Sequence, residues 1–300
     1  MQSALDRRQT ILEILSDRRQ ESVANLMHEL NVSRRTILRD IEILSCSAPI
    51  YTVQGNGGGI RVEDSYYVGR RYLKPEQAAL LDKLASTLQG EERAVMDSIL
   101  KANQGYCPAY GDDPITQEAL ARVRELFGGA CEAWFVMSGT GANVIALQSL
   151  ISSWHAVACP SSAHINVDEC GAVQKFTQGR LQAIDTPDGK LTPELIAPRL
   201  YGNRDQHHSQ FRVISISQST EYGSLYTPNE ISALADFAHQ HDMYLHLDGA
   251  RLANAAAALN CSLAAITRDA GADIVSFGGT KNGLLFGEAI ISFRPEINNA

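Results

Sequence analysis

Two apolar, strand-like segments lie in the last quarter of the chain. Each is followed by a residue whose side chain can take part in catalysis. Residues 243–247 run into Asp248, and residues 273–277 run through a Gly-Gly-Thr turn into Lys281. Such segments alternate with helical ones from about residue 116 to 293, which is typical of a mostly parallel sheet with helices on its faces. The carboxyl ends of parallel strands open onto one crevice. The sequence therefore predicts an α/β domain in which Asp248 and Lys281 reach one site.

An aspartate and a lysine in one crevice are typical of pyridoxal phosphate (PLP) enzymes. The lysine anchors the cofactor aldehyde, and the carboxylate keeps the pyridine nitrogen protonated so that the ring accepts electrons. We assign Lys281 the first role and Asp248 the second. We expect Gly278 and Gly279, which lack a Cβ atom, to let the backbone approach a ligand closely. Arg251 can bind a substrate carboxylate through two parallel hydrogen bonds, although an Asp-Gly-x-Arg segment can also be a turn closed by a surface ion pair.

A strand, a small polar turn and a helix predict the place of the cofactor phosphate. The apolar run 133–137 precedes Ser138, Gly139 and Thr140, and residues 143–150 have the pattern of a helix. Free backbone N–H groups and the positive end of the helix dipole meet at such a turn and bind anions. We predict that Ser138, Gly139 and Thr140 bind the phosphate; the alternative is an ordinary strand-to-helix turn.

Five segments resemble the threonine aldolase and β-eliminating lyase family of PLP enzymes. They read AYGDDPITQEALARVRELFG, FVMSGTGANVIAL, AHINVDECGA, HLDGARLANA and FGGTKNG, and the resemblance extends from about residue 103 to 293. It implies the fold type I architecture of PLP enzymes and cleavage of a β-hydroxy amino acid to glycine and an aldehyde. It also implies that His164 stacks on the cofactor ring and helps to move a proton, with Asp168 and Glu169 beside it as supporting groups.

The end of another predicted strand provides a further candidate site residue. The resemblance to the family also predicts how the subunits are arranged. The apolar strand 211–218 ends near Gln218, Thr220 and Glu221, and Glu221 is our candidate for contact with the cofactor or a substrate hydroxyl. The alternative is a surface carboxylate. Family members complete each site with residues of a neighbouring subunit, in the segment that contains Tyr110 and Asp112. We therefore expect a homo-oligomer, either a dimer or a tetramer.

The sequence departs from the family pattern both before and after the region that resembles it. The family's first segment carries a serine that binds the substrate carboxylate, and a different sequence stands in its place. The small C-terminal domain of the family, which supplies a second carboxylate-binding arginine, has no counterpart before the last residue, Ala300. We expect one wall of the pocket to be missing, apolar surface to be exposed there, and activity to be impaired.

The first 74 residues are slightly basic, whereas the rest of a chain with net charge −8 is acidic. They predict helices at about 3–15 and 22–30, a tight turn, and a third helix at 33–44 capped by Ser33. This layout is a helix-turn-helix. Arg34, Arg35, Thr36 and Arg39 fall on the outward half of the third helix, where side chains contact the major groove or its phosphates. The alternative is a solvated basic face.

Strand-like residues around the glycine-rich turn 55–59 predict a wing beside these helices. Together, VSRRTILRDIEIL, the NGGGI turn and the following helical stretch resemble the DeoR-like winged helix that opens WYL-type transcriptional regulators. We divide the chain into a winged helix-turn-helix at residues 1–66, a helical connector at 67–102 and a threonine-aldolase-like PLP domain at 103–300.

The sequence contains no apolar run long enough to span a bilayer and no apolar signal-peptide core, so we expect a cytoplasmic protein without a membrane partner. Scattered cysteines and the isolated pair His207 and His208 give no metal pattern. Three functions remain. The first is a low-specificity threonine aldolase that carries a DNA-binding domain. The second is a transcriptional regulator whose PLP domain senses an amino acid, by analogy with MocR-type regulators. The third is a non-functional fusion of two gene fragments.

Overall fold

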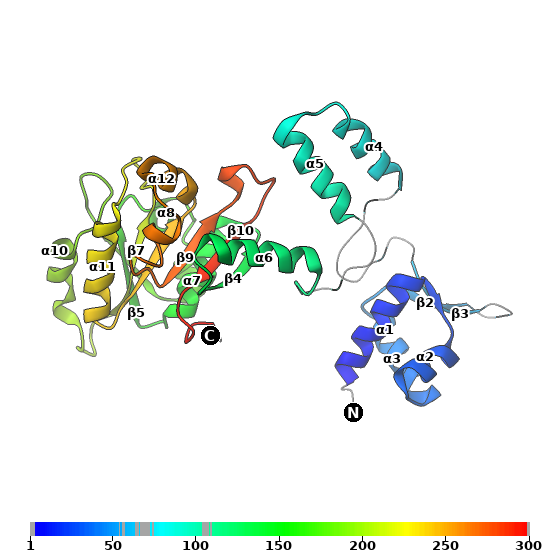
Figure 1. Cartoon of the computed structure of the whole chain (residues 1–300). Coiled ribbons are helices and arrows are strands. Elements are labelled where there is room, and N and C mark those ends of the chain that lie inside the picture. Colours follow the sequence, from blue (N-terminus) through cyan, green and yellow to red (C-terminus); the bar gives the residue numbers. More distant parts are fainter. Residues whose placement is uncertain are drawn as a thin grey trace. The chain divides into compact units, whose positions relative to one another are not determined.

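The computed structural model describes residues 4–53, 55, 58–63, 66, 73, 75–103, 108 and 110–298. The chain forms two compact units, Met1–Glu118 and Ala119–Ala300 (Figure 1). The domain boundary that we predict at residue 103 stays a prediction. In the part of the chain that is described, no helix combines the length and the apolar character needed to cross a membrane.

The first unit begins with the helix-turn-helix that the sequence predicts. Its elements are α1 (Ala4–Arg18), β1 (Gln20–Glu21), α2 (Val23–Leu30), α3 (Arg34–Ser45), β2 (Ile50–Val53), β3 (Gly59–Val62), α4 (Pro75–Ala85) and α5 (Gly90–Ala102). The hydroxyls of Ser22 and Ser33 cap α2 and α3 by accepting hydrogen bonds from backbone N–H groups three residues ahead. Strands β2 and β3 form the predicted hairpin, although residues 54, 56 and 57 of its turn lie outside the described residues. Strand β1, which the sequence did not reveal, pairs with β3.

A buried aspartate fastens α1 to α3 in this unit. Asp40 is only 2% exposed and accepts hydrogen bonds from Arg7 Nε at 2.6 Å and Arg8 Nε at 2.9 Å. Burial alone raises the pKa of this carboxyl, but the two guanidinium groups outweigh burial and leave the pKa below its ordinary value. Beside this contact, Ile11, Leu26 and other apolar side chains form the unit's core.

A seven-stranded sheet forms the centre of the second unit, in the order β4-β10-β9-β8-β7-β5-β6. Neighbours from β9 to β6 are parallel, and β10 is antiparallel to both β9 and β4. The elements are α6 (Pro114–Leu126), β4 (Glu132–Val136), α7 (Gly139–Leu150), β5 (His155–Pro160), α8 (His164–Val167), α9 (Ala172–Thr177), β6 (Arg180–Ile184), α10 (Pro193–Ile196), η1 (Ala197–Gly202), β7 (Gln210–Ser217), α11 (Pro228–Gln240), β8 (Tyr244–Gly249), α12 (Leu252–Leu259), η2 (Ala264–Ile266), β9 (Ile274–Gly278), η3 (Thr280–Asn282) and β10 (Glu288–Ser292).

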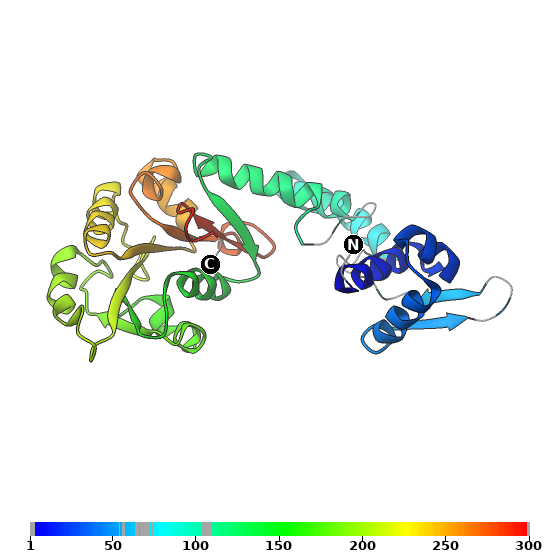
Figure 2. The same cartoon turned by 90° about the horizontal axis from the view of Figure 1, so that it is seen from below.

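Two apolar clusters cover the two faces of this sheet. Successive residues of one strand enter different clusters, as Val213 and Ile214 of β7 do, because side chains alternate along a strand. Helix α7 packs in one cluster, while α11 and α12 pack in the other, so that α7 lies on the opposite side of the strands from α11 and α12 (Figure 2). The predicted α/β fold, a mostly parallel sheet between helices, is confirmed.

Candidate active site

A cavity of about 340 Å³ lies at the carboxyl ends of the parallel strands. Seven residues predicted from the sequence line it: Ser138, Gly139, Thr140, His164, Glu221, Asp248 and Lys281. The other lining residues are Met137, Asn143, Glu169, Ala250, Thr280, Phe286 and Glu288. The strand-end rule therefore brings together side chains that are more than 140 positions apart in the sequence.

Asp248 is held in place as a hydrogen-bond acceptor near the end of β8. It is 8% exposed; its Oδ2 accepts a hydrogen bond from Asn143 Nδ2 at 2.9 Å, and its Oδ1 accepts one from the backbone N–H of Ala250 at 3.0 Å. Two donors on a largely buried carboxyl group fix its orientation. The side chain can therefore present its oxygen atoms to a ligand in the cavity.

A chain of buried hydrogen bonds joins Asp248 to His164. The amide of Asn143 donates both to Asp248 and to Glu169 Oε1, the latter at 2.8 Å, and Glu169 Oε1 lies 2.9 Å from His164 Nδ1. Because a carboxylate oxygen accepts, Nδ1 of His164 is the donor in this contact. The sequence indicated Glu169 only as a supporting group and gave Asn143 no role.

The start of α7 forms an anion-binding turn. The hydroxyl of Ser138 accepts a hydrogen bond from the N–H of Gly141 at 3.1 Å, whereas the N–H groups of Gly139 and Thr140 have no acceptor among the described residues. A Cβ atom on Gly139 would meet nothing within 4 Å, so the space beside this turn is open. Two free N–H groups at a helix N-terminus suit a phosphate.

Lys281 stands on the short helix η3, which follows β9, and its side chain is exposed to the cavity. The turn is held by Asn282, whose Nδ2 donates to the carbonyl oxygens of Gly278 at 2.8 Å and Ala250 at 3.2 Å. A Cβ atom on Gly278 would lie 2.3 Å from Ala250 O, and one on Gly279 would lie 2.5 Å from Gly287 O. These glycines therefore allow a close approach to the protein's own backbone, and the close approach to a ligand that we predict for them stays a prediction.

Polar groups of the cavity suit PLP as the predicted ligand. Lys281 offers an amine, Asp248 a carboxylate and the α7 turn its free N–H groups, all within one cavity. Two buried atoms of the wall, Asn143 Oδ1 and Glu169 Oε2, have no hydrogen-bond partner among the described residues. Unpaired buried polar atoms cost free energy, so their presence beside the cavity is consistent with a polar ligand or water nearby.

Several predicted residues do not lie where the sequence suggested. Arg251 caps α12 and is half-buried, but it is not among the described residues that line the cavity. Gln218 is fully buried and bonds the backbone of Tyr226 through both ends of its amide. Of the three residues predicted near the end of β7, Gln218, Thr220 and Glu221, only Glu221 lines the cavity.

Glu288 is a lining carboxylate that the sequence did not reveal. It pairs with Gly278 across β9 and β10, and its Oε2 accepts a hydrogen bond from the N–H of Gly279 at 2.9 Å. Only the antiparallel pairing of β10 brings it there, and no motif around it signals that pairing.

His246, beneath the site, makes the second unit sensitive to acid. It is completely buried between the hydroxyls of Ser215, 2.9 Å from Nδ1, and Ser276, 3.1 Å from Nε2. Burial lowers the pKa of His246 from 6.5 to about 4, although the nearby carboxylate of Asp248 opposes the shift. At neutral pH the ring is therefore uncharged.

We predict that His246 lowers the free energy of unfolding by about 3 kcal/mol as the pH falls from 6.5 towards 4. The unfolded chain binds a proton at this histidine in that range, whereas the folded chain does not. Urea unfolding at a series of pH values, followed for the wild type and His246→Gln, checks this. The free energy of unfolding of the variant should fall less across this pH range than that of the wild type. If the two free energies fell equally with pH, the predicted contribution of His246 would be excluded.

Three arginines form an exposed basic face on α3 of the first unit. Arg34, Arg35 and Arg39 line a shallow hollow with Leu38 and Glu42. None of the three guanidinium groups makes an ion pair within the described residues.

Thr36 differs from the other residues predicted to contact DNA. Its N–H and hydroxyl both engage the hydroxyl of Ser33, with 2.9 Å between the two hydroxyl oxygens, and it is only half-exposed. Thr36 thus contributes to the cap of α3.

Similarities to other proteins agree with this geometry. The chain is 44% identical over 198 residues to the low specificity L-threonine aldolase of a Pseudomonas species, covering 66% of this chain and 57% of that protein. It is 42% identical to the low specificity L-threonine aldolase of Pseudomonas aeruginosa, covering 67% and 58%. A Leishmania major threonine aldolase structure superposes with a TM-score of 0.65 at 30% identity, covering 71% of this chain and 62% of that one. The chain thus spans less than two thirds of these relatives.

Two family profiles match different parts of the chain. Residues 7–61 match the family described as HTH domain, which agrees with the fold of α1 to β3. Residues 85–300 match the family described as Beta-eliminating lyase, and this match includes the cavity with Lys281 and Asp248. The chain therefore belongs to the beta-eliminating lyase family.

Proposed function

We propose that this chain is a PLP-dependent lyase of the low-specificity threonine aldolase type, which cleaves a β-hydroxy amino acid to glycine and an aldehyde. The observation that carries the proposal is the single cavity that contains Lys281, Asp248 and His164, with the last two joined through Asn143 and Glu169. Enzymes of this family use PLP, and relatives named low specificity L-threonine aldolase support the choice of reaction.

Each residue has a role that follows from its position. When bound, PLP supplies the electron sink for cleavage of the Cα–Cβ bond. Lys281 would provide the amine that binds the cofactor aldehyde, and Asp248 would provide the hydrogen-bond acceptor for the pyridine nitrogen. The N–H groups of Gly139 and Thr140, with the Ser138 hydroxyl, would bind the phosphate.

Residues around the same cavity would bind the substrate and accept its proton. His164 would lie beside the bound cofactor, and its Nε2 would take the proton of the substrate's β-hydroxyl as the Cα–Cβ bond breaks. A proton returned to Cα would complete glycine. Glu221 is our candidate for contact with the substrate hydroxyl, and Arg251 remains our candidate for the substrate carboxylate. Its guanidinium would have to turn towards the cavity when substrate is bound.

Release of aldehyde from the substrate tests this function. The full chain, loaded with PLP, should convert threonine to glycine and acetaldehyde, which a coupled alcohol dehydrogenase assay detects through loss of NADH absorbance. Serine deamination to pyruvate, followed in parallel, separates aldol cleavage from β-elimination. Pyruvate without acetaldehyde, or neither product, would contradict the proposed reaction.

A specific feature supports a second candidate function, transcriptional regulation through DNA binding. The match to an HTH domain and the exposed arginines on α3 support this function, because the third helix of such a fold can enter a DNA groove with its positive charge outward. We propose that the first unit binds DNA and that the PLP domain either catalyses its reaction independently or senses the amino acid.

We predict that replacing Arg34 and Arg35 together with glutamine weakens DNA binding by about tenfold or more and lowers the slope of log affinity against log salt by about 1 to 2. Each arginine is expected to displace a counterion from a phosphate. Gel-shift titrations at several salt concentrations measure both quantities. Arg93→Gln is the matched control, because Arg93 lies on α5 in an exposed ion pair with Asp97. Equal loss in the control would exclude a specific role for α3.

An exposed apolar surface beside the cavity supports the predicted homo-oligomer. Phe286 is 66% exposed and lines both the candidate active site and a neighbouring apolar pocket of about 340 Å³. Met137, which lines the same two cavities, is 79% exposed. We propose that a second copy of the chain covers this surface, as a dimer or a tetramer. Sedimentation velocity should show an oligomer that Phe286→Ser weakens, while the exposed variant Tyr201→Ser leaves it unchanged.

A further inference from the structure

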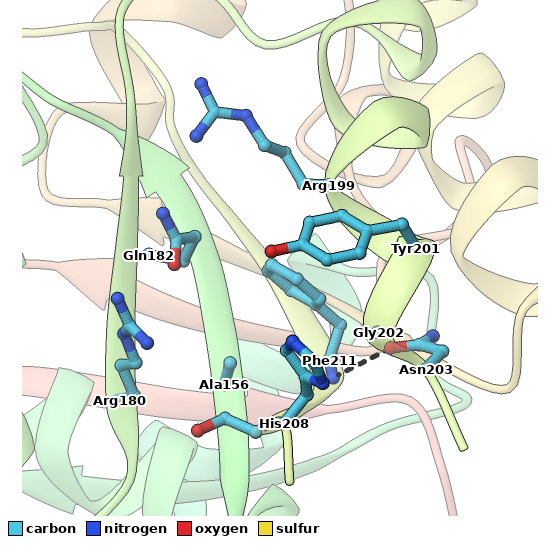
Figure 3. Close-up of a pocket in the computed structure, with 10 residues that line it drawn as sticks. Ala156, Arg180, Gln182, Arg199, Tyr201, Gly202, Asn203, His208 and Phe211 are labelled. Carbon is cyan, nitrogen blue, oxygen red and sulfur yellow. Dashed lines mark hydrogen bonds between the residues drawn. The ribbon is translucent and has the colours of Figure 1, made fainter. Parts of the chain in front are cut away.

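A second polar pocket, of about 230 Å³, lies at the opposite edge of the sheet from the candidate active site. It opens where the strands begin: Arg180 is the first residue of β6, and Ala156 of β5 pairs with both Arg180 and Phe211 of β7. Figure 3 shows Arg180 and Gln182 on one side of the pocket and Arg199 and Tyr201 of η1 on the other. The lyase reaction has no use for this pocket, because every proposed catalytic group lies at the other strand ends.

The charge of the pocket is positive and uncompensated. Arg180 and Arg199 make no ion pair or side-chain hydrogen bond within the described residues, and no carboxylate lines the pocket. The nearest acidic side chain in the wall segment, Asp205, is occupied by His208 Nδ1 at 3.2 Å and by the N–H of His207 at 2.9 Å. In the same unit Arg122, Arg124, Arg268 and Arg294 pair with carboxylates, whereas Arg180 and Arg199 make no such pair within the described residues.

The loop that closes the pocket is already fixed in shape. The side chain of Gln210 makes hydrogen bonds with the backbone of this loop at three residues. Its Nε2 donates to the carbonyl oxygens of Asp205 at 2.9 Å and His208 at 2.8 Å. Its Oε1 accepts a hydrogen bond from the N–H of Arg204 at 2.5 Å. The ring of His208 packs so closely on Gly202 that a Cβ atom there would lie 2.6 Å from the ring. A preformed wall lowers the conformational entropy lost when a ligand binds.

Aromatic rings form one side of this pocket. The ring of Tyr201 contacts the ring of His208 edge-on, with 5.4 Å between centroids, and Phe211 lies beside Tyr201 (Figure 3). Gln182 adds a neutral amide donor to the two guanidinium groups.

We propose that this pocket binds a small ligand through an oxyanion, either a phosphate group or a carboxylate, held between Arg180 and Arg199. Planar guanidinium groups present paired N–H donors that match both kinds of oxyanion. The amide of Gln182 and the hydroxyl of Tyr201 supply further donors. The site is separate from the phosphate-binding turn at Ser138, which lies at the carboxyl ends of the strands.

Isothermal titration calorimetry of the full chain with inorganic phosphate, and separately with succinate, tests the site. Titrations are made with and without saturating PLP, because phosphate can also occupy the Ser138 turn. We expect binding that persists in PLP and in Ser138→Ala, and that weakens about tenfold or more in Arg180→Gln and in Arg199→Gln. Both arginines are exposed, so these variants should retain the wild-type thermal unfolding midpoint. Arg122→Gln, in an exposed ion pair on α6, is the matched control.

The two probes identify the kind of oxyanion. Arginine-dependent binding of phosphate alone indicates a phosphate ligand, and arginine-dependent binding of succinate alone indicates a carboxylate ligand; either result supports the site. Phosphate binding that disappears with PLP or in Ser138→Ala would place it at the cofactor turn and overturn the proposal. Binding of neither probe at millimolar concentration, or equal binding by the arginine variants and Arg122→Gln, would overturn it as well. These outcomes do not depend on whether the chain cleaves threonine.

Discussion

Lys281→Ala is expected to reduce threonine cleavage by about 10⁴-fold or more, to the background of the assay. In the proposed function the lysine amine binds the cofactor aldehyde, and no other lysine lines the cavity in the described part of the chain. Its side chain is exposed and makes no hydrogen bond or ion pair within that part, so the variant should fold as the wild type does. Steady-state kinetics with threonine, together with thermal unfolding, measure both effects.

Lys175→Ala is the control for this loss. Lys175 lies on α9 with an exposed side chain, away from the residues that line the cavity. Its activity should equal that of the wild type. If Lys281→Ala kept more than a small fraction of wild-type turnover, another amine would have to bind the cofactor, and the assignment of Lys281 would be wrong.

Asp248→Asn is expected to lower kcat/KM by about 10³-fold while PLP remains bound. The amide has nearly the shape of the carboxylate and can still accept a hydrogen bond from Asn143. It carries no negative charge, however, so it cannot hold the proton on the ring nitrogen, and the ring accepts electrons poorly. Kinetics and cofactor content, measured on the same samples, separate lost chemistry from lost binding.

Asp168→Asn is the matched control for the aspartate. Asp168 is exposed at the end of α8, next to the buried Glu169, and it does not line the cavity. The same chemical change there should leave kcat/KM within a factor of about 2. Equal losses in the two variants would show that charge near the site, and not the contact of Asp248 with the ring, controls the rate.

The placement of Asp248 and Lys281 in one cavity could be predicted, because each lies at or just beyond the end of a strand. Asp248 and Lys281 stand after short apolar segments, and parallel strands place such positions at one edge of the sheet. The turn at Ser138 was predictable for a related reason, since a small polar turn between strand and helix leaves N–H groups free. These rules need only local periodicity and the direction of the strands.

The supporting contacts could not be predicted, because they depend on packing between distant elements. Asn143 meets Asp248 across 105 positions of sequence, and nothing in its helical surroundings distinguishes it from a surface amide. Glu288 reaches the cavity only through the antiparallel pairing of β10. The buried pairing of Asp40 with Arg7 and Arg8 is of the same kind, since the sequence shows three charges without showing which one is enclosed.

The most direct test of the central claim is the visible absorption spectrum of the full chain with PLP, compared between the wild type and Lys281→Ala, before and after glycine is added. We predict a visible band that requires Lys281 and that changes when glycine enters the site, because cofactor and amino acid share one cavity. No band, or a band of equal strength in both proteins, would contradict the claim that Lys281, Asp248 and the α7 turn form a PLP site.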